Sequence, residues 1–486
     1  MNKKARCALL IASTILIAGH IAAQTSPAWN AQTIQQLKQI QQTALHDDQA
    51  YRYAAHLTDN IGPRMAGSPQ AAAAVEYVAA EMRKLGLDVR LEKVTVPHWV
   101  RGEEHAELVS YPGQVADTQQ KIVVTALASL NCATPPEGIT ADVVVVNNFD
   151  ELAALPNEKV QGKVVVFDEH FDQKLAEAGF PLEAYGQAVA YRERGRLEAA
   201  RKGAVASLVR SVGGADFRLP HTGETGYDPK LPGIPAGAIT AEDASLLARL
   251  TAQGPVHMHL VLTPKLLGEV ETYNVVADLK GSKHPEQVVI VSGHIDSWDL
   301  GTGALDDAAG VAVAMQAAQV LKKLKLQPER TIRVVAWMAE EIGIYGGRAY
   351  AKQHAGDIGN HFATIETDLG AGHAMGINVC CDDAMLKTLQ PVGDVLLSSG
   401  AGVLRSSEDT GADVIPLKIS GVPTFSPLQD ARTYFDYHHS AADTLDKIDP
   451  QLLQENAAVV AVLAYALANM QTQLPRTPQP LPDWMK

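Results

Sequence analysis

The 486-residue sequence contains few cysteines, no excess of positive charge and no long hydrophobic run beyond its N-terminus. Of its four cysteines, Cys7 lies in the N-terminal leader described below. The other three, Cys132, Cys380 and Cys381, are too few for a disulfide-stabilised scaffold, so stability has to come from a hydrophobic core. We expect the adjacent pair Cys380-Cys381 to be two free thiols, the alternative being a strained vicinal disulfide. No cysteine spacing is typical of a thiolate zinc site.

The charge balance excludes one large class of partners. Lys and Arg number 41 against 55 Asp and Glu, which gives a net charge of −14. Since a protein that binds a phosphate backbone usually needs a basic face, we expect no nucleic-acid partner. With 46% hydrophobic and 20% charged residues, the chain has the composition of a globular protein, and its length allows two or three domains.

The N-terminus has the pattern of a secretory signal peptide over residues 1–23. Lys3, Lys4 and Arg6 precede an apolar run from Cys7 to Ala18, and small residues follow. The run is about half of the ~20 residues that a membrane-spanning helix needs, and we identify no later spanning segment. We therefore expect an exported protein, periplasmic or secreted, without stable membrane insertion after cleavage. The alternative is an uncleaved N-terminal anchor.

Several catalytic motifs are missing from the sequence. There is no His-Glu-x-x-His zinc helix, no Gly-x-Ser-x-Gly nucleophile elbow and no Walker-type phosphate loop. A thermolysin-like protease, a serine hydrolase of the α/β type and a P-loop nucleotidase are therefore excluded.

The middle of the chain is rich in short β-branched runs and predicts a separate domain. Strands are predicted at Asp142–Val146 and Lys163–Phe167, and a helix at Arg194–Lys202 is followed by Gly203-Ala204 and another strand. This order is typical of a small α+β domain, placed at residues 113–266, in which we identify no catalytic constellation.

The segments on either side, residues 24–112 and 267–474, are predicted to form one larger domain, with a Pro-rich tail at 475–486. A strand is predicted over Val89–Val96, with Pro97 ending it. From Tyr273 onward strands alternate with helices. This predicts an α/β fold, a mainly parallel mixed sheet covered by helices on both faces. In such sheets ligands bind beyond the carboxyl ends of the strands.

Five places hold side chains that ligate metals, most of them directly after a predicted strand. They are Gly293-His294-Ile295-Asp296, Gly303-Ala304-Leu305-Asp306-Asp307, Ala339-Glu340-Glu341, Glu366-Thr367-Asp368, and His438-His439-Ser440 before Asp443-Thr444. Each alone has an ordinary structural interpretation, such as acidic residues at a helix N-terminus. Together they are expected to converge on one edge of the sheet, where several carboxylates would repel one another strongly without a cation.

The order and spacing of these motifs resemble the zinc aminopeptidase family of co-catalytic di-zinc exopeptidases, most strongly its carboxypeptidase Q-like branch. Ile61-Gly62-Pro63-Arg64 and Tyr273-Asn274-Val275 match this family as well. The middle segment is similar to a protease-associated domain, which would roof the cleft or act as a spacer. The resemblance covers nearly all of the chain after the leader.

The resemblance implies two zinc ions per chain. Asp306 would bridge them, His294 and Asp368 would complete the protein ligands of one ion, and Glu341 and His439 those of the other. His439 is preferred to His438 because the family's ligand directly precedes Ser or Thr. Nitrogen and oxygen ligands without thiolate suit zinc, and two metals about 3.5–4 Å apart can share a hydroxide and polarise a scissile carbonyl.

Two further carboxylates have implied roles. Glu340 would be the general base and acid, taking a proton from water and delivering it to the leaving amine. Asp296 would hydrogen-bond the far nitrogen of His294 and fix its tautomer.

The resemblance therefore implies an exported zinc metallo-exopeptidase that hydrolyses dipeptides or short unblocked peptides. It also implies a homodimer, for which the residues give no independent support. Three alternatives stay open on the same scaffold. They are an N-acyl amino acid deacylase, a glutaminyl cyclase, which would need a single zinc, and a non-catalytic receptor-like binding protein.

Overall fold

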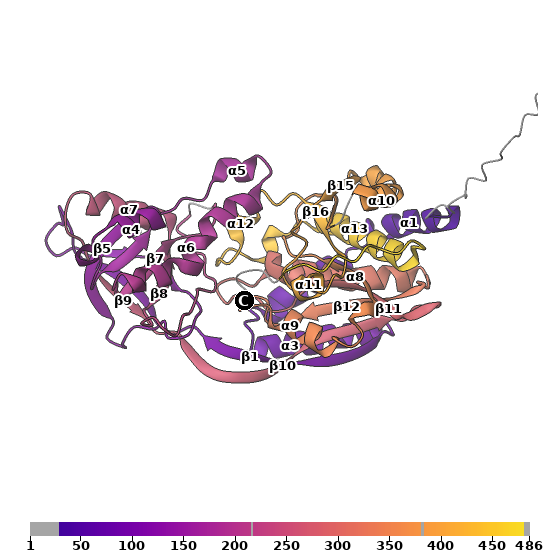
Figure 1. Ribbon diagram of the computed structural model, residues 1–486, viewed down its shortest axis with the longest axis horizontal. Helices are drawn as coiled ribbons and strands as arrows, with labels where there is room; N and C mark the ends of the chain where they lie inside the picture. The colour runs from indigo at the N-terminus through magenta and orange to yellow at the C-terminus, as the bar shows by residue number, and fades with distance from the viewer. Residues whose placement is uncertain (1–28, 215–216, 381–382, 481–486) are drawn as a thin grey trace, which may run out of the picture.

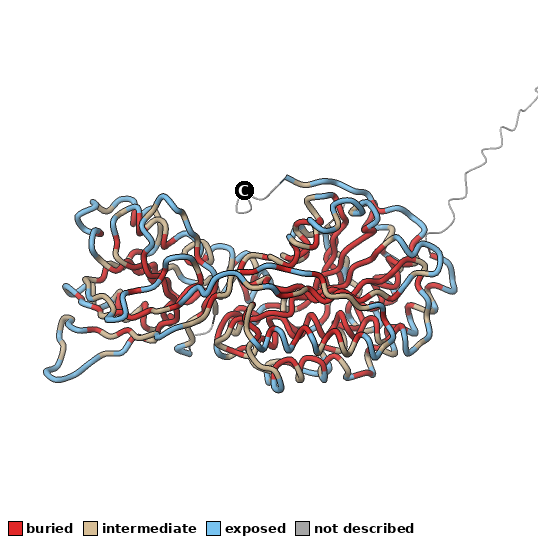
Figure 2. The backbone as a smooth tube through the Cα atoms, turned by 90° about the horizontal axis from the view of Figure 1, so that it is seen from below, coloured by how far each residue is buried: buried red, intermediate tan, exposed pale blue. Residues whose placement is uncertain are grey.

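A computed structural model describes residues 29–214, 217–380 and 383–480, and the predicted signal peptide lies outside them. The chain forms a larger and a smaller lobe, each built around an eight-stranded sheet (Figure 1). Figure 2 shows buried backbone concentrated inside both lobes, with a narrow waist between them.

The sheet of the larger lobe has the order β1-β10-β12-β11-β13-β16-β14-β15. Its strands are β1 (Asp88–Val100), β10 (Lys265–Leu279), β11 (His284–His294), β12 (Arg330–Trp337), β13 (His361–Glu366), β14 (Ala374–Val379), β15 (Val403–Ser406) and β16 (Thr424–Gln429). The four central strands β12, β11, β13 and β16 run parallel, while β10 and β14 pair antiparallel with their inner neighbours. This arrangement confirms the predicted mainly parallel mixed sheet.

Helices cover both faces of this sheet, as predicted. Alternate residues of β11 point to opposite faces, so Val289 and Val291 join one hydrophobic cluster and Val288 and Ile290 another. The first face packs against α8 (Ala309–Lys323) and α13 (Pro450–Asn469), and the second against α9 (Tyr345–Gln353) and α11 (Ile415–Ile419). The other helical segments of this lobe are α1 (Ala31–Ala44), α2 (Gln49–Ala55), η1 (His56–Ile61), α3 (Pro69–Lys84), η3 (Ala304–Ala308), η4 (Ile358–Asn360), α10 (Asp383–Leu396), η5 (Leu397–Ser399), α12 (Tyr434–Tyr437) and η6 (Leu445–Lys447).

The smaller lobe holds the second sheet, in the order β3-β2-β9-β5-β6-β7-β8-β4. Its strands are β2 (Glu104–Ser110), β3 (Gln120–Ile122), β4 (Val124–Ala126), β5 (Ile139–Val146), β6 (Val164–Phe167), β7 (Ala206–Arg210), β8 (Ala236–Ile239) and β9 (His257–Leu262). Its helical segments are α4 (Phe149–Ala154), η2 (Asn157–Lys159), α5 (Gln173–Glu177), α6 (Pro181–Arg201) and α7 (Ala241–Thr251). Helix α6 starts well before the predicted Arg194.

The smaller lobe leaves and rejoins the larger one at paired residues. Val100, at the end of β1, pairs with Lys265, at the start of β10, so the insertion enters and exits side by side. Strand β2 already belongs to the second sheet, which therefore begins before residue 113.

Pro97 does not end its strand. Strand β1 continues to Val100, with a register shift between Pro97 and Trp99. β1 is the edge strand of its sheet, where the missing N–H of a proline leaves no neighbouring carbonyl without a donor.

Helix α13 corrects the prediction that no segment after the leader has the length and apolarity of a membrane span. Its 20 residues pass that test by length and composition, with a mean hydropathy of 1.3. In the structure 78% of this window is buried, and the helix packs against α1, α8 and the first sheet as a core helix. A helix that is apolar all round is typical of such a position.

Candidate metal centre

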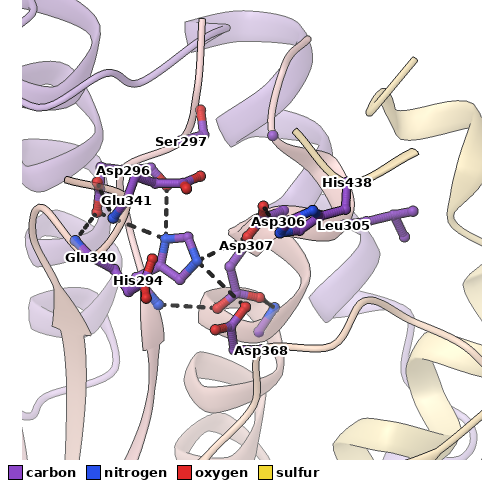
Figure 3. A network of polar contacts seen from close by, with 12 residues as sticks. His294, Asp296, Ser297, Leu305, Asp306, Asp307, Glu340, Glu341, Asp368 and His438 are labelled. Atoms are coloured by element: carbon purple, nitrogen blue, oxygen red, sulfur yellow. Dashed lines mark hydrogen bonds and ion pairs between the residues drawn. The ribbon is translucent and has the colours of Figure 1, made fainter. Parts of the chain in front are cut away.

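The central parallel strands bring the predicted ligands to one edge of the sheet. β11 ends at His294, β12 leads into Glu340-Glu341, and β13 leads into Asp368. Because β11 lies between β12 and β13, the carboxyl ends of all three meet. Figure 3 shows these side chains gathered around the imidazole of His294.

Asp306 lies between two groups of ligand atoms. Its Oδ1 is 3.0 Å from Nε2 of His294, and the same nitrogen is 3.5 Å from Oδ1 of Asp368. Its Oδ2 is 3.3 Å from Nε2 of His439. One carboxylate thus directs one oxygen toward each of two imidazoles, which is the arrangement that a ligand shared by two cations requires.

The second group contains one more histidine than expected. Nε2 of His439 lies 3.0 Å from Oε2 of Glu341 as well as close to Asp306. His438 stacks on His439, with ring centroids 3.6 Å apart, and its Nε2 is 3.6 Å from Asp306 Oδ2. Contact with two of the predicted ligands favours His439 over His438.

The second ring nitrogens of His294 and His439 each face a backbone carbonyl. Nδ1 of His294 is 3.1 Å from the carbonyl oxygen of Asp296, and Nδ1 of His439 is 3.1 Å from that of Thr222. A proton on Nδ1 then donates to the carbonyl and leaves the Nε2 lone pair available to a cation.

The carboxylate of Asp296 has a different task from the one expected. Its Oδ1 is 3.8 Å from Nδ1 of His294, too far for a hydrogen bond, so the tautomer-fixing contact comes from the carbonyl of the same residue. The fully buried carboxylate instead accepts the backbone N–H groups of Glu340 at 3.1 Å and Glu341 at 3.4 Å. Asp296 therefore positions the segment that carries both glutamates (Figure 3).

Arg64 holds two loops of the site together. Its fully buried guanidinium donates to the carbonyl oxygens of Ile295, Thr302 and Gly303 at 2.7, 2.7 and 2.8 Å. Ile295 lies between His294 and Asp296, and Gly303 precedes the turn that carries Asp306. This contact explains the Ile61-Gly62-Pro63-Arg64 motif.

Asp443 supports the Asp306 turn from the other side. Its carboxylate accepts three successive backbone N–H groups, those of Ala304, Leu305 and Asp306, at 3.0, 2.7 and 3.2 Å. Burial raises the pKa of Asp443 to about 7. The hydrogen bonds of Asp443 therefore connect the loop that carries His439 to the turn that carries Asp306.

Buried acidic groups dominate the electrostatics of the centre. Burial, reinforced by neighbouring carboxylates, raises the pKa values of Glu340, Glu341 and Asp368. Burial opposes protonation of His294, but the adjacent Asp368 and Asp306 raise its pKa well above the ordinary value. The site therefore attracts positive charge.

An unpaired carboxylate oxygen and the clustering of ligand atoms both indicate that these residues fit a metal. Oδ2 of Asp306 is buried and has no hydrogen-bond partner among the described residues. The ligand atoms of His294, Asp306 and Asp368 lie within 4.8 Å of one another, and so do those of Asp306, His438 and His439. Imidazole and carboxylate donors without thiolate are a donor set that zinc accepts.

The centre opens into a cavity of about 1220 Å³ between the lobes. The larger lobe lines it with Asp306, Glu340 and Asp368, and helix α6 of the smaller lobe with Tyr185 and Arg192. The smaller lobe is thus a wall of the cavity.

Comparison with known proteins agrees with this geometry. The model for peptidase family M28 matches residues 274–464. Carboxypeptidase Q of Homo sapiens is 37% identical over 432 residues, which cover 88% of this chain and 87% of the relative. The chain belongs to peptidase family M28.

Solved structures place this M28 peptidase among zinc aminopeptidase folds. A peptidase M28 precursor from Shewanella amazonensis SB2B superposes with a TM-score of 0.84 at 38% identity, covering 92% of this chain and 99% of that one. A zinc aminopeptidase from Bacillus subtilis gives 0.63 at 19% identity over 87% and 96% of the chains, a likeness of fold alone. The family model and the carboxypeptidase Q relatives make the chain a peptidase by family.

Two residues at the centre of the M28 peptidase were missed in the sequence, and both come from the smaller lobe. Thr222 exchanges two hydrogen bonds with His439, since its N–H also donates to the His439 carbonyl oxygen at 2.9 Å. Backbone contacts of this kind leave no sequence signal. Arg192 does leave one, because it lies four residues after Ala188 and eight after Ala184 on the buried stripe of α6, where an arginine is out of place.

Proposed function

We propose that this M28 peptidase is an exported exopeptidase with two zinc ions, which releases single residues from dipeptides or short peptides with free ends. The observation that carries the proposal is the position of Asp306 between His294 and His439, with one oxygen toward each. The ligands of one ion are then His294, Asp306 and Asp368, and those of the other are Asp306, Glu341 and His439.

Residues of the chain itself carry out proton transfer and hold the transferring group in place. When bound, zinc supplies a Lewis acid and a water that ionises near neutral pH. Glu340 lines the cavity beside the ligands, and burial raises the pKa of its carboxyl group well above the ordinary value. A carboxylate of raised pKa can take the proton of the attacking water and return it to the nitrogen of the leaving amine. Asp296 holds the backbone of Glu340 in place for that transfer.

Export rests on the leader at residues 1–23, with Lys3, Lys4 and Arg6 before its apolar run. Mass spectrometry of the protein recovered from the periplasm or the medium tests this part, and an intact N-terminus in a cytoplasmic fraction would contradict it.

The activity is tested with purified mature protein and dipeptides or tripeptides that are unblocked, N-acetylated or C-amidated, with products followed by mass spectrometry. Cleavage of unblocked peptides that a chelator abolishes, with N-acetylated peptides spared, is the expected result. Release of the acyl group would instead make the protein a deacylase. Binding of zinc without turnover of any substrate would favour a receptor-like binding protein.

A further inference from the structure

Arg192 differs from the other buried arginines of the described chain. Arg64, Arg196 and Arg330 each direct Nε to an oxygen, those of Ile295, Ile234 and Gln287 respectively. Arg210 and Arg333 form ion pairs with aspartates. Nε of Arg192 is buried and has no partner, and among the described residues no carboxylate forms an ion pair with the guanidinium, although Glu193 and Glu341 act on its charge from farther away. A buried cation without a directly paired anion carries a desolvation cost that a ligand can offset.

The guanidinium is held in place and lines the cavity. Its Nη1 donates to Oη of Tyr185 at 2.8 Å and lies 3.5 Å from the Thr222 carbonyl oxygen. Gly223 packs against it so closely that a Cβ there would come within 2.6 Å of Cζ. Arg192 is only 8% exposed and is part of the cavity wall. The guanidinium group of Arg192 is therefore already in position before a ligand binds.

Arg192 is also next to the metal centre. Its Nη1 lies 3.2 Å from Nδ1 of His439, so one imidazole ring separates the guanidinium from the ligand nitrogen Nε2. In a dipeptide, only the amide nitrogen and one Cα lie between the scissile carbonyl carbon and the terminal carboxylate. One dipeptide could therefore place its terminal carboxylate at Arg192 and its scissile bond at the metal ligands.

We infer that Arg192 binds the terminal carboxylate of the substrate residue on the leaving side of the scissile bond. The inference rests on the proposed function and assigns one residue of the smaller lobe to the recognition of the free carboxyl end. A guanidinium binds carboxylate through paired N–H donors, which lysine cannot reproduce. The carboxylates of Asp306, Glu340 and Glu341 in the same cavity would repel an anion placed elsewhere, so the binding position is restricted to the cationic wall.

The test compares kcat/KM for Leu-Ala, Leu-Ala-amide and Leu-Glu-amide in wild type, Arg192→Gln and Arg192→Lys. Wild type is expected to prefer Leu-Ala over its amide by roughly 10- to 100-fold, the value of a charge-assisted hydrogen bond. Arg192→Gln should bring this ratio close to one, and Arg192→Lys should give an intermediate ratio. Arg201→Gln is the control and should keep the wild-type ratio, because Arg201 is exposed on the same helix and does not line the cavity.

The ratio separates carboxylate binding from damage to the metal centre, because both substrates use the same zinc ions. Zinc content by elemental analysis accompanies every variant. An unchanged ratio in Arg192→Gln overturns the inference and leaves the peptidase activity standing. If Arg192→Gln lowers kcat/KM for Leu-Glu-amide but leaves kcat/KM for Leu-Ala unchanged, Arg192 binds an acidic side chain of the substrate instead. A wild type that hydrolyses none of the three, with zinc bound, overturns the proposed function and this inference together.

Discussion

Replacing Arg64 by lysine should destabilise the protein although the charge is kept. The guanidinium has five acceptors, all of them backbone carbonyl oxygens. They are those of Ile295, Thr302, Gly303, Gly62 and Leu57, at 2.7, 2.7, 2.8, 3.2 and 3.4 Å. Nε, Nη1 and Nη2 of Arg64 serve these carbonyls from three positions, whereas a lysine ammonium has its three N–H groups on one nitrogen, so the carbonyls at two of the three positions lose their donor. At about 1.5 to 3 kcal/mol for each hydrogen bond to a charged group, we expect a loss of about 3 kcal/mol or more in the free energy of unfolding.

The assay is urea unfolding of the zinc-loaded and zinc-free protein, together with zinc affinity. Because Arg64 fixes the loops that carry His294 and Asp306, Arg64→Lys should also weaken zinc binding by roughly 10- to 100-fold. The matched control is Arg201→Lys, an exposed arginine paired with Glu198, which should stay within about 0.5 kcal/mol of wild type. If Arg64→Lys unfolds within about 1 kcal/mol of wild type in both forms, the carbonyl network does not have the assigned role.

Three other predictions concern catalysis, metal and pH. Glu340→Gln should retain zinc by elemental analysis and lose roughly 100- to 10,000-fold in kcat, and turnover close to wild type would refute its role in proton transfer. Zinc content should approach two per chain, and chelation should lower the unfolding temperature since Glu341, Asp368 and Asp306 are then left without a cation; a single zinc in active enzyme would contradict the two-ion site. The hydroxyl of Tyr350 accepts a hydrogen bond from Arg333 and donates one to Nε2 of His361, an arrangement that needs a neutral His361 ring. Burial accordingly lowers the pKa of His361 from 6.5 to about 4. The stability this provides is present above pH ~6.5 and is lost as the pH falls toward 4, by about 3 kcal/mol in total, and His361→Gln should lack this part of the pH dependence in urea unfolding.

The sequence predicted the larger lobe well because its signals are local. Strands β11 and β12 contain the apolar runs 288–291 and 334–337, as expected for strands buried on both faces, and helix α3 has Ser68 as N-cap with its Oγ accepting from Ala71 N. The ligand residues follow these strands directly, so their convergence could be expected from the order of elements.

The remainder depended on contacts that no short pattern carries. Helix α6 buries alanine, glycine and arginine rather than large apolar residues, which hid its first half and with it Arg192. The carboxylate of Asp296 was predicted to hydrogen-bond His294, but it accepts two backbone N–H groups instead. A sequence motif does not indicate which backbone N–H groups a side chain will contact. The start of the second sheet at β2 depends on pairing with β9, which lies far away in the chain.

The antiparallel pair of β1 and β10 has a consequence for the order in which the chain folds. Every strand of the second sheet finds its neighbours within residues 104–262, so the smaller lobe can complete its hydrogen bonding from contiguous chain. Strand β1 has to wait for β10, which emerges only after that lobe has been made, and the central helix α13 arrives last of all. Closing such a long loop from an unfolded chain costs conformational entropy, so we expect β1 to pair with β10 after the smaller lobe has formed. Once folded, the smaller lobe would hold Val100 and Lys265 side by side and so shorten the loop that is still to be closed.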